Sequence, residues 1–275
     1  MSRLISHSEI TTYLDCQKKW DLVYNKGLKV DNIHLQFGSM GHEVLETRKI
    51  PDETLYPELK EAFGITSWHN YFTTIFNELD EYFKDYEVLH REYRVENEIL
   101  KGVIDVVWRH KTTGRILITD YKFSTKNKGF EDILLDEQMY LYSLIYGTQN
   151  NLSIDDIDIG YVNIPKCEMT KPRVLKNGQI SKDKAQNTTY KLYIDTIQEQ
   201  GLNIDDYSDV LDDFKDKKMV DVAIAQMNKD MMIRIAQNVD NVLKDMQKGY
   251  ILEKCTFQCK YCDFLQYCKY NKEIK

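Results

Sequence analysis

The segment ILITDYKFS, residues 116–124, places Asp120 and Lys122 two positions apart behind an apolar run. The apolar run predicts a buried β-strand, and the side chains of a strand alternate between its two faces. The carboxylate and the ammonium would therefore share one face of a strand that otherwise packs in a core. For these two residues alone, a surface ion pair is the simpler explanation, so further residues must decide.

A hairpin would bring a second carboxylate to the same place. If KTTG, residues 111–114, is a symmetric four-residue turn, Asp105 lies opposite Asp120. Directly opposed residues have Cβ atoms about 4.5–5.5 Å apart, and two carboxylates at that distance repel each other. Lys122 compensates for part of this charge, and a divalent cation would compensate for more, because Mg²⁺ prefers carboxylate and phosphate oxygens.

Such a group could hydrolyse a phosphodiester. A metal held by the carboxylates lowers the pKa of a bound water, and a lysine can orient that water or stabilise the transition state. An ion pair beside an unrelated Asp105 is a comparable interpretation at this stage.

Periodicity and turn signals predict the elements that must position these residues. Alternating segments predict strands over 88–100, 103–110, 115–123 and 157–164. Helical spacing predicts helices over about 6–26, 39–49, 66–84, 136–147, 188–200 and 228–248. SHSE at 6–9 is typical of a capping box, and Asn177-Gly178 is typical of a hairpin turn.

Further motifs follow one another in a defined order. LISHSEITTYLDC (4–16) precedes Gly38, His42, Leu45 and Glu46, which form G-x-x-x-H-x-x-L-E. GVID (102–105), DYK (120–122) and QMYLY (138–142) come next. In this combination the chain resembles the RecB-like branch of the PD-(D/E)XK nuclease superfamily. The stretch NGQISKDKAQNTTYKLY (177–193) is similar to segments of bacteriophage-encoded members.

The resemblance implies a role for each matched residue. The ligands of Mg²⁺ or Mn²⁺ would be His42, Asp105, Asp120 and, through its backbone carbonyl, Tyr121. Lys122 would be the catalytic lysine. Gln138 and Tyr142 would support the substrate or the geometry of the site, and Glu98 would assist just before the hairpin.

Cysteines form a second group of candidate ligands. Cys259, Cys262 and Cys268 follow the pattern C-x2-C-x5-C, with Cys255 just before them and Cys16 near the other end of the chain. Closely spaced thiolates suit Zn²⁺ or an iron–sulfur cluster. Nothing in the sequence indicates an oxidising compartment, which makes disulfides a weak alternative.

The same RecB-like branch includes AddB-type and CRISPR-adaptation nucleases, in which one early cysteine and a C-terminal C-x2-C-x5-C hold a [4Fe–4S] cluster. The resemblance implies that Cys16, Cys259, Cys262 and Cys268 bind such a cluster and join residues 1–30 to residues 249–275. Zn²⁺ bound by the four C-terminal cysteines, Cys255 among them, is the alternative. Cys167 receives no role.

Composition limits the class of protein. Of 275 residues, 42% are hydrophobic and 29% charged, which is typical of a globular protein. There is no apolar run of about 18 residues and no signal-peptide core, so we expect a cytoplasmic protein without a membrane partner, in the host cytoplasm if it is phage-encoded. The net charge of −7 argues mildly against nucleic acid as a partner, but residues 122–128 and 171–184 are locally basic.

We therefore expect one α/β domain over residues 1–275, with a restriction-endonuclease-like core in which helices flank a central mixed β-sheet. Its expected function is metal-dependent hydrolysis of DNA, from an end, in recombination, repair or replication, with a helicase or recombination protein as a partner. An iron–sulfur DNA-binding module of a repair complex without nuclease activity is one alternative. An RNA-processing nuclease is the other, since the sequence does not locate contacts to a 2′-hydroxyl.

Overall fold

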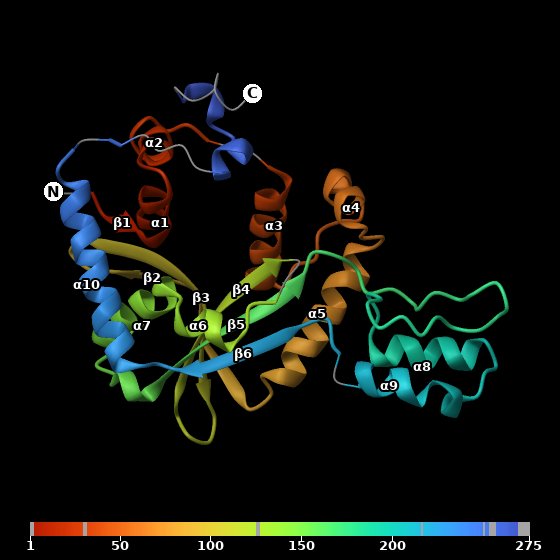
Figure 1. The fold of residues 1–275 in the computed structure, drawn as a ribbon. Coiled ribbons are helices and arrows are strands. Elements are labelled where there is room, and N and C mark those ends of the chain that lie inside the picture. The colour runs from red at the N-terminus through yellow and green to blue at the C-terminus, as the bar shows by residue number, and fades with distance from the viewer. Residues whose placement is uncertain are drawn as a thin grey trace.

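A six-stranded mixed β-sheet forms the centre of the protein, as the computed structural model shows for residues 3–29, 32–124, 127–215, 217–249, 251–252 and 257–268 (Figure 1). Cys255 lies outside these residues. The strands are β1 (Ile5–Ser6), β2 (Tyr86–Glu96), β3 (Leu100–His110), β4 (Ile116–Ser124), β5 (Ile157–Pro165) and β6 (Asp221–Gln226). Their order is β1-β3-β4-β5-β6, and β2 also pairs with β3. The β4–β5 and β1–β3 pairs are parallel and the others antiparallel, so the predicted α/β class with a mixed sheet is confirmed.

Helices cover both faces of this sheet. They are α1 (His7–Asp15), α2 (Gln17–Trp20), α3 (Ile33–Thr47), α4 (Pro57–Phe63), α5 (Trp68–Tyr82), α6 (Phe130–Leu134), α7 (Glu137–Gln149), α8 (Tyr190–Glu199), α9 (Ser208–Phe214) and α10 (Lys229–Met246). One face packs against α1, α6, α7 and α10, and the other against α3, α4 and α5. None of the helices in the described ranges is both long enough and apolar enough to cross a bilayer.

A third, smaller core lies beside the sheet, where α8 and α9 pack together (Figure 1). Tyr193 and Phe214 stack at its centre with ring centroids 5.5 Å apart. The predicted turn at Asn177-Gly178 is confirmed, because Val174 and Ile180 pair across it in an isolated antiparallel bridge.

The N-terminal helix is shorter than its periodicity predicts. Ser6 caps α1 by accepting a hydrogen bond from the Glu9 backbone N–H. The Glu9 carboxylate does not complete a capping box. It is buried, pairs with Arg3 and accepts a hydrogen bond from the Trp20 indole at 3.0 Å. The helix ends where Cys16 adopts an extended conformation (φ −161°, ψ 108°), and a new helical segment begins after it.

Two other predicted boundaries are wrong for local reasons. The turn between β2 and β3 lies at residues 97–99 and not at 101–102, because the Asn97 side chain accepts hydrogen bonds from the backbone N–H groups of Ile99 and Leu100. Helix α3 starts at Ile33 and not at 39, because the Asn32 side chain caps it through the Leu35 N–H.

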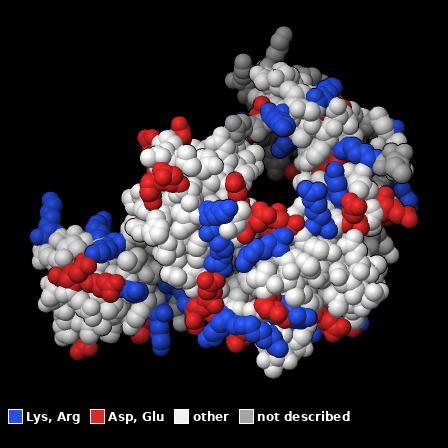
Figure 2. Space-filling model, turned by 180° about the vertical axis from the view of Figure 1, so that it is seen from behind, with Lys and Arg blue, Asp and Glu red and all other residues white. Residues whose placement is uncertain are grey.

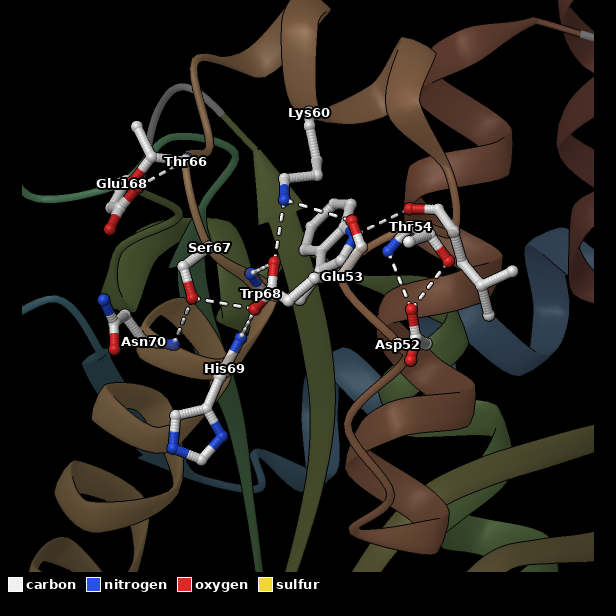
Figure 3. A network of polar contacts seen from close by, with 11 residues as sticks. Asp52, Glu53, Thr54, Lys60, Thr66, Ser67, Trp68, His69, Asn70 and Glu168 are labelled. Atoms are coloured by element: carbon white, nitrogen blue, oxygen red, sulfur yellow. Dashed lines mark hydrogen bonds and ion pairs between the residues drawn. The ribbon is translucent and has the colours of Figure 1, made fainter.

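The connection from α3 to α5 is held by one carboxylate (Figure 3). Glu53 accepts hydrogen bonds from the backbone N–H groups of Trp68 and His69, from the Ser67 hydroxyl and from the Lys60 ammonium. It therefore satisfies donors that the first turn of α5 leaves without partners inside the helix. The ion pair with Lys60 and the other hydrogen bonds lower the pKa of Glu53 to about 2.

Candidate active site

The edge of β3 that faces β4 is divided between two partners. β4 pairs with β3 only as far as Val106, which lies opposite Thr119. β1 pairs with residues 100–101 of the same edge. Within the described part of the chain, residues 102–105 have no strand partner on this side. The two strands therefore separate at Asp105, in the register that the hairpin predicted.

The ring of Tyr142 on α7 occupies part of this opening. A Cβ atom at Gly102 would lie only 2.2 Å from Cζ of that ring, so this position of β3 requires glycine. The Tyr142 hydroxyl accepts a hydrogen bond from the His7 backbone N–H, and burial raises the pKa of Tyr142 to about 12. Tyr142 thus connects α7, β3 and the start of α1, and its role in supporting the substrate or the site stays a prediction.

Asp105 turns its carboxylate into the opening. Its Oδ2 atom accepts a hydrogen bond from the Tyr121 backbone N–H at 2.7 Å and lies 3.3 Å from Nδ1 of His42. The alternation of side chains between the two faces of β3 is interrupted at Asp105. Ile104 and Val107 pack in one core, whereas Val106 packs in the other. The irregularity gives Asp105 a position that a regular strand would not provide.

Asp120 and Lys122 share a face of β4, as the strand pattern predicts. The Lys122 Nζ atom lies 2.7 Å from Oδ2 of Asp120, and the Gln138 side-chain amide donates to Oδ1 at 3.0 Å. Burial and the charge of Asp105 raise the pKa of Asp120 to about 6, against the influence of Lys122. Burial disfavours the Lys122 ammonium, but the charge and hydrogen bond of Asp120 outweigh it and raise the pKa of Lys122.

His42, Asp105 and Glu92 form a compact set of ligand atoms. One atom from each lies within 4.8 Å of the others, a geometry that can hold a metal ion. Burial disfavours the charged imidazole, but the hydrogen bond and charge of Asp105 raise the pKa of His42. Burial and the charge of Asp105 also raise the pKa of Glu92. Such crowding of negative charge is what a divalent cation relieves.

The position of His42 depends on a close helix–strand contact. α3 approaches β4 at Gly41, where a Cβ atom would lie 2.4 Å from the ring of Phe123. The His42 and Phe123 ring centroids are 5.8 Å apart. The glycine beside the histidine therefore allows α3 to present the imidazole to the sheet.

The sequence did not identify Glu92 as a site residue. Its backbone adopts φ +46°, which is uncommon for a residue with a side chain, close to a break in the β2–β3 register at 88–90. Glu98, which the sequence favoured, is exposed in the turn at 97–99 and does not line the pocket around Asp105. The sequence offered no signal that separates Glu92 from the other acidic residues of this segment, Glu96 and Glu98.

An open pocket of about 540 Å³ joins these residues. Its lining includes the carboxylates Glu92, Asp105 and Asp120 and the lysines Lys122, Lys128 and Lys166. Figure 2 shows a hollow on the back of the molecule with acidic side chains gathered beside it and lysine and arginine side chains around them. A site with this charge pattern can bind a cation on its carboxylates and an anion beside it. The ligand role predicted for the Tyr121 carbonyl stays a prediction.

Four cysteines from the two ends of the chain line a separate small cavity of about 20 Å³. They are Cys16, Cys259, Cys262 and Cys268, the set that the resemblance named. The extended backbone at Cys16 places it between α1 and α2, and its Sγ accepts a hydrogen bond from the Lys19 backbone N–H at 3.4 Å. The other three come from the segment 257–268. Nothing in the described residues pairs these cysteines in disulfides.

Comparison with known proteins finds one family model that covers almost the whole chain. The family model described as the PD-(D/E)XK nuclease superfamily matches residues 4–269. Among curated proteins, none matches the chain significantly.

Two solved structures are similar to the chain at 12% identity each. A protein from Eubacterium rectale named "Putative exonuclease" has a TM-score of 0.52, over 96% of this chain and 87% of that one. A protein named SSO0001 has a TM-score of 0.28, over 94% of this chain and 96% of that one. At 12% identity, the similarity to the Eubacterium rectale protein shows a shared fold and nothing more. The TM-score of 0.28 is too low for SSO0001 to be compared further.

Proposed function

Because the chain belongs to the PD-(D/E)XK nuclease superfamily, we propose that it is a divalent-metal-dependent deoxyribonuclease that degrades DNA from an end. The observation that carries the proposal is the convergence of His42, Glu92 and Asp105 beside the Asp120–Lys122 ion pair in one open pocket. The name of the Eubacterium rectale protein supports action at an end. A helicase or recombination protein would supply such ends.

Each residue of the pocket would have its own role in hydrolysis. His42, Glu92, Asp105 and Asp120 would hold Mg²⁺ or Mn²⁺, which supplies charge neutralisation and lowers the pKa of water. The Lys122 ammonium lies 2.7 Å from the Asp120 carboxylate. At this position it would stabilise charge on the phosphate or orient the attacking water. Gln138 fixes the Asp120 carboxylate by donating to its second oxygen.

Glu92 takes the place that we expected for Glu98. It belongs to the compact set with His42 and Asp105, and its carboxylate is half-buried in the pocket. The two carboxylates of this set suit Mg²⁺ or Mn²⁺, whereas the imidazole nitrogen is a ligand that transition metals accept more readily than Mg²⁺ does.

For the cysteine cavity we propose a [4Fe–4S] cluster with a structural role. What supports the proposal is that Cys16 lines this cavity together with Cys259, Cys262 and Cys268, so thiols from both ends of the chain meet there. Four thiolates are the usual ligands of such a cluster. Zn²⁺ bound by the four C-terminal cysteines stays the alternative, and Cys255 lies outside the described residues.

Digestion of end-labelled linear and closed circular single-stranded DNA tests the nuclease proposal, with Mg²⁺ or Mn²⁺ under anaerobic conditions. We expect the wild type to degrade the linear strand and leave the circle intact, and Lys122→Ala to be inactive on both. Cleavage of the circle would show endonuclease action instead. If neither protein cuts DNA while the wild type binds it, the DNA-binding module becomes the better interpretation, and RNA is the next substrate.

A further inference from the structure

Lys128, which follows β4 in the chain, lines the catalytic pocket, and a buried side chain holds its backbone there. Asn163 on β5 lies beside Lys122 in the sheet register and is 1% exposed. Its Oδ1 accepts a hydrogen bond from the Lys128 backbone N–H at 2.9 Å, and its Nδ2 donates to the Lys128 carbonyl at 3.0 Å. Nδ2 also donates to Asp221 at 3.2 Å. A buried amide that binds both backbone groups of one residue holds that residue as a neighbouring strand would.

The Lys128 side chain shares a platform with the catalytic lysine. The Nζ atoms of Lys122 and Lys128 each lie 5.2 Å from the ring centroid of Tyr161. The Tyr161 hydroxyl donates to Asp136, the N-cap residue of α7. Since α7 also carries Gln138, which binds Asp120, the platform and the catalytic carboxylate are positioned by the same helix.

The two lysines differ in their anionic partners. Lys122 is paired with Asp120 at 2.7 Å, whereas Lys128 has no carboxylate within ion-pair distance among the residues that the structure describes. Its ammonium is exposed and lines the same pocket. The third lysine of the lining, Lys166, donates to the His34 carbonyl at 3.0 Å. Among the described residues, neither Lys128 nor Lys166 has a carboxylate partner, and Lys128 is the one whose backbone is held by Asn163 beside Lys122.

We propose that Lys128 forms a binding subsite for a second phosphate of the substrate strand, next to the phosphate that is cleaved. This inference rests on the proposed nuclease function and deepens it. Asn163 and Tyr161 act as positioning residues for this lysine. Because Asn163 holds the Lys128 backbone, binding a phosphate does not have to order that backbone. A contact with a phosphate that does not react contributes to substrate binding and not to the chemical step.

The test combines protein variants with substrates in which one phosphate at a time is a neutral methylphosphonate. On unmodified single-stranded DNA, we expect Lys128→Ala to raise KM about tenfold with kcat changed less than about twofold, and Lys128→Arg to retain most of the affinity. Lys176→Ala removes an exposed lysine from the Asn177-Gly178 turn and should change neither. In a plot of the logarithm of the binding constant against the logarithm of the salt concentration, the slope for Lys128→Ala should be about 0.7 less steep than that for the wild type.

At one position beside the cleaved phosphate, the methylphosphonate should weaken binding to the wild type about tenfold and have no further effect on Lys128→Ala. Equal losses for both proteins at every position would overturn the inference. If the wild type cleaves DNA and Lys128→Ala has the same KM as the wild type, the subsite inference is wrong and the proposed nuclease function stands. If the wild type binds DNA but does not cleave it, the same variants and substrates are compared by their dissociation constants. If it does neither, the proposed function fails and the subsite with it.

Discussion

The Asp105 carboxylate accepts a hydrogen bond from the Tyr121 backbone N–H at 2.7 Å, and Asp105 lies one residue beyond the last position of β3 that pairs with β4. It thus serves the fold, by satisfying a strand N–H where the ladder ends, and the site, by facing His42. These two roles can be separated by substitution.

Asp105→Asn should keep the fold and lose the activity. The amide oxygen can still accept from Tyr121, but the negative charge next to His42 is gone. We expect cleavage to fall by at least about 100-fold with little change in Tm, whereas Asp105→Ala should also lose about 1–3 kcal/mol of stability by leaving the N–H without an acceptor. Thermal melts beside cleavage assays check this. Asp105→Asn with near-normal activity would remove Asp105 from the proposed metal site.

Glu92 and Glu98 form a matched pair for metal binding. Glu92→Gln should raise the Mn²⁺ or Mg²⁺ concentration required for half-maximal cleavage by about tenfold or more, because a neutral amide is a weaker ligand. Glu98→Gln, in the exposed turn, should leave the metal dependence unchanged. A metal titration of both variants decides the matter, and the reverse pattern would support the role that the sequence assigned to Glu98.

The contact between Gly102 and Tyr142 predicts a coupling in stability. Gly102→Ala should cost about 1–3 kcal/mol in the wild type, because its Cβ would overlap the Tyr142 ring. In a Tyr142→Ala background the same change should cost much less. Urea unfolding of the four proteins measures this. Gly38→Ala is the control, since its Cβ has no atom within 4 Å and the change should be neutral or stabilising. Additive costs at Gly102 and Tyr142 would contradict the contact.

The cysteine cavity predicts a metal signature that depends on specific thiols. Anaerobically purified wild type should be brown and contain iron and sulfide, and Cys262→Ser should lose both and unfold at a lower temperature. Cys167→Ser should behave like the wild type, because Cys167 does not line this cavity. Zinc without iron in the wild type would favour the alternative metal.

Glu53 predicts a stability difference that depends on pH. Its pKa is about 2 in the folded chain, below the ordinary value of 4.5, so its contribution is complete above about pH 4.5 and is lost as the pH falls toward 2. Glu53→Gln should lower stability at pH 7 by about 1 kcal/mol, the size of a helix cap, and Tm by about 2 °C. The difference from wild type should shrink at pH 3. Glu98→Gln serves as an exposed carboxylate control, and a constant difference would contradict the low pKa.

The hairpin around the site could be predicted because a strand period of two and a four-residue turn fix which residues face each other. That reasoning placed Asp105 at the position facing Asp120 and put Lys122 beside Asp120. Motif order then added His42, which the structure brings to Asp105.

What the sequence did not predict depends on non-local structure. Helical spacing continues through Cys16, so the break there shows only in the folded chain. Glu92 competes with other acidic residues in the same segment, and its selection depends on a positive φ and on where the Asn97 turn falls. The backbone position of Lys128 depends on an asparagine 35 residues away in the sequence.

The shared cavity of Cys16 and Cys268 also orders events during synthesis. The first of these thiols leaves the ribosome long before the last, so a nascent chain exposes Cys16 while its three partners do not yet exist. A group bound by all four can be inserted only after translation has passed Cys268. Insertion of such a group would therefore follow synthesis of the whole sheet, whose last strand, β6, ends at Gln226.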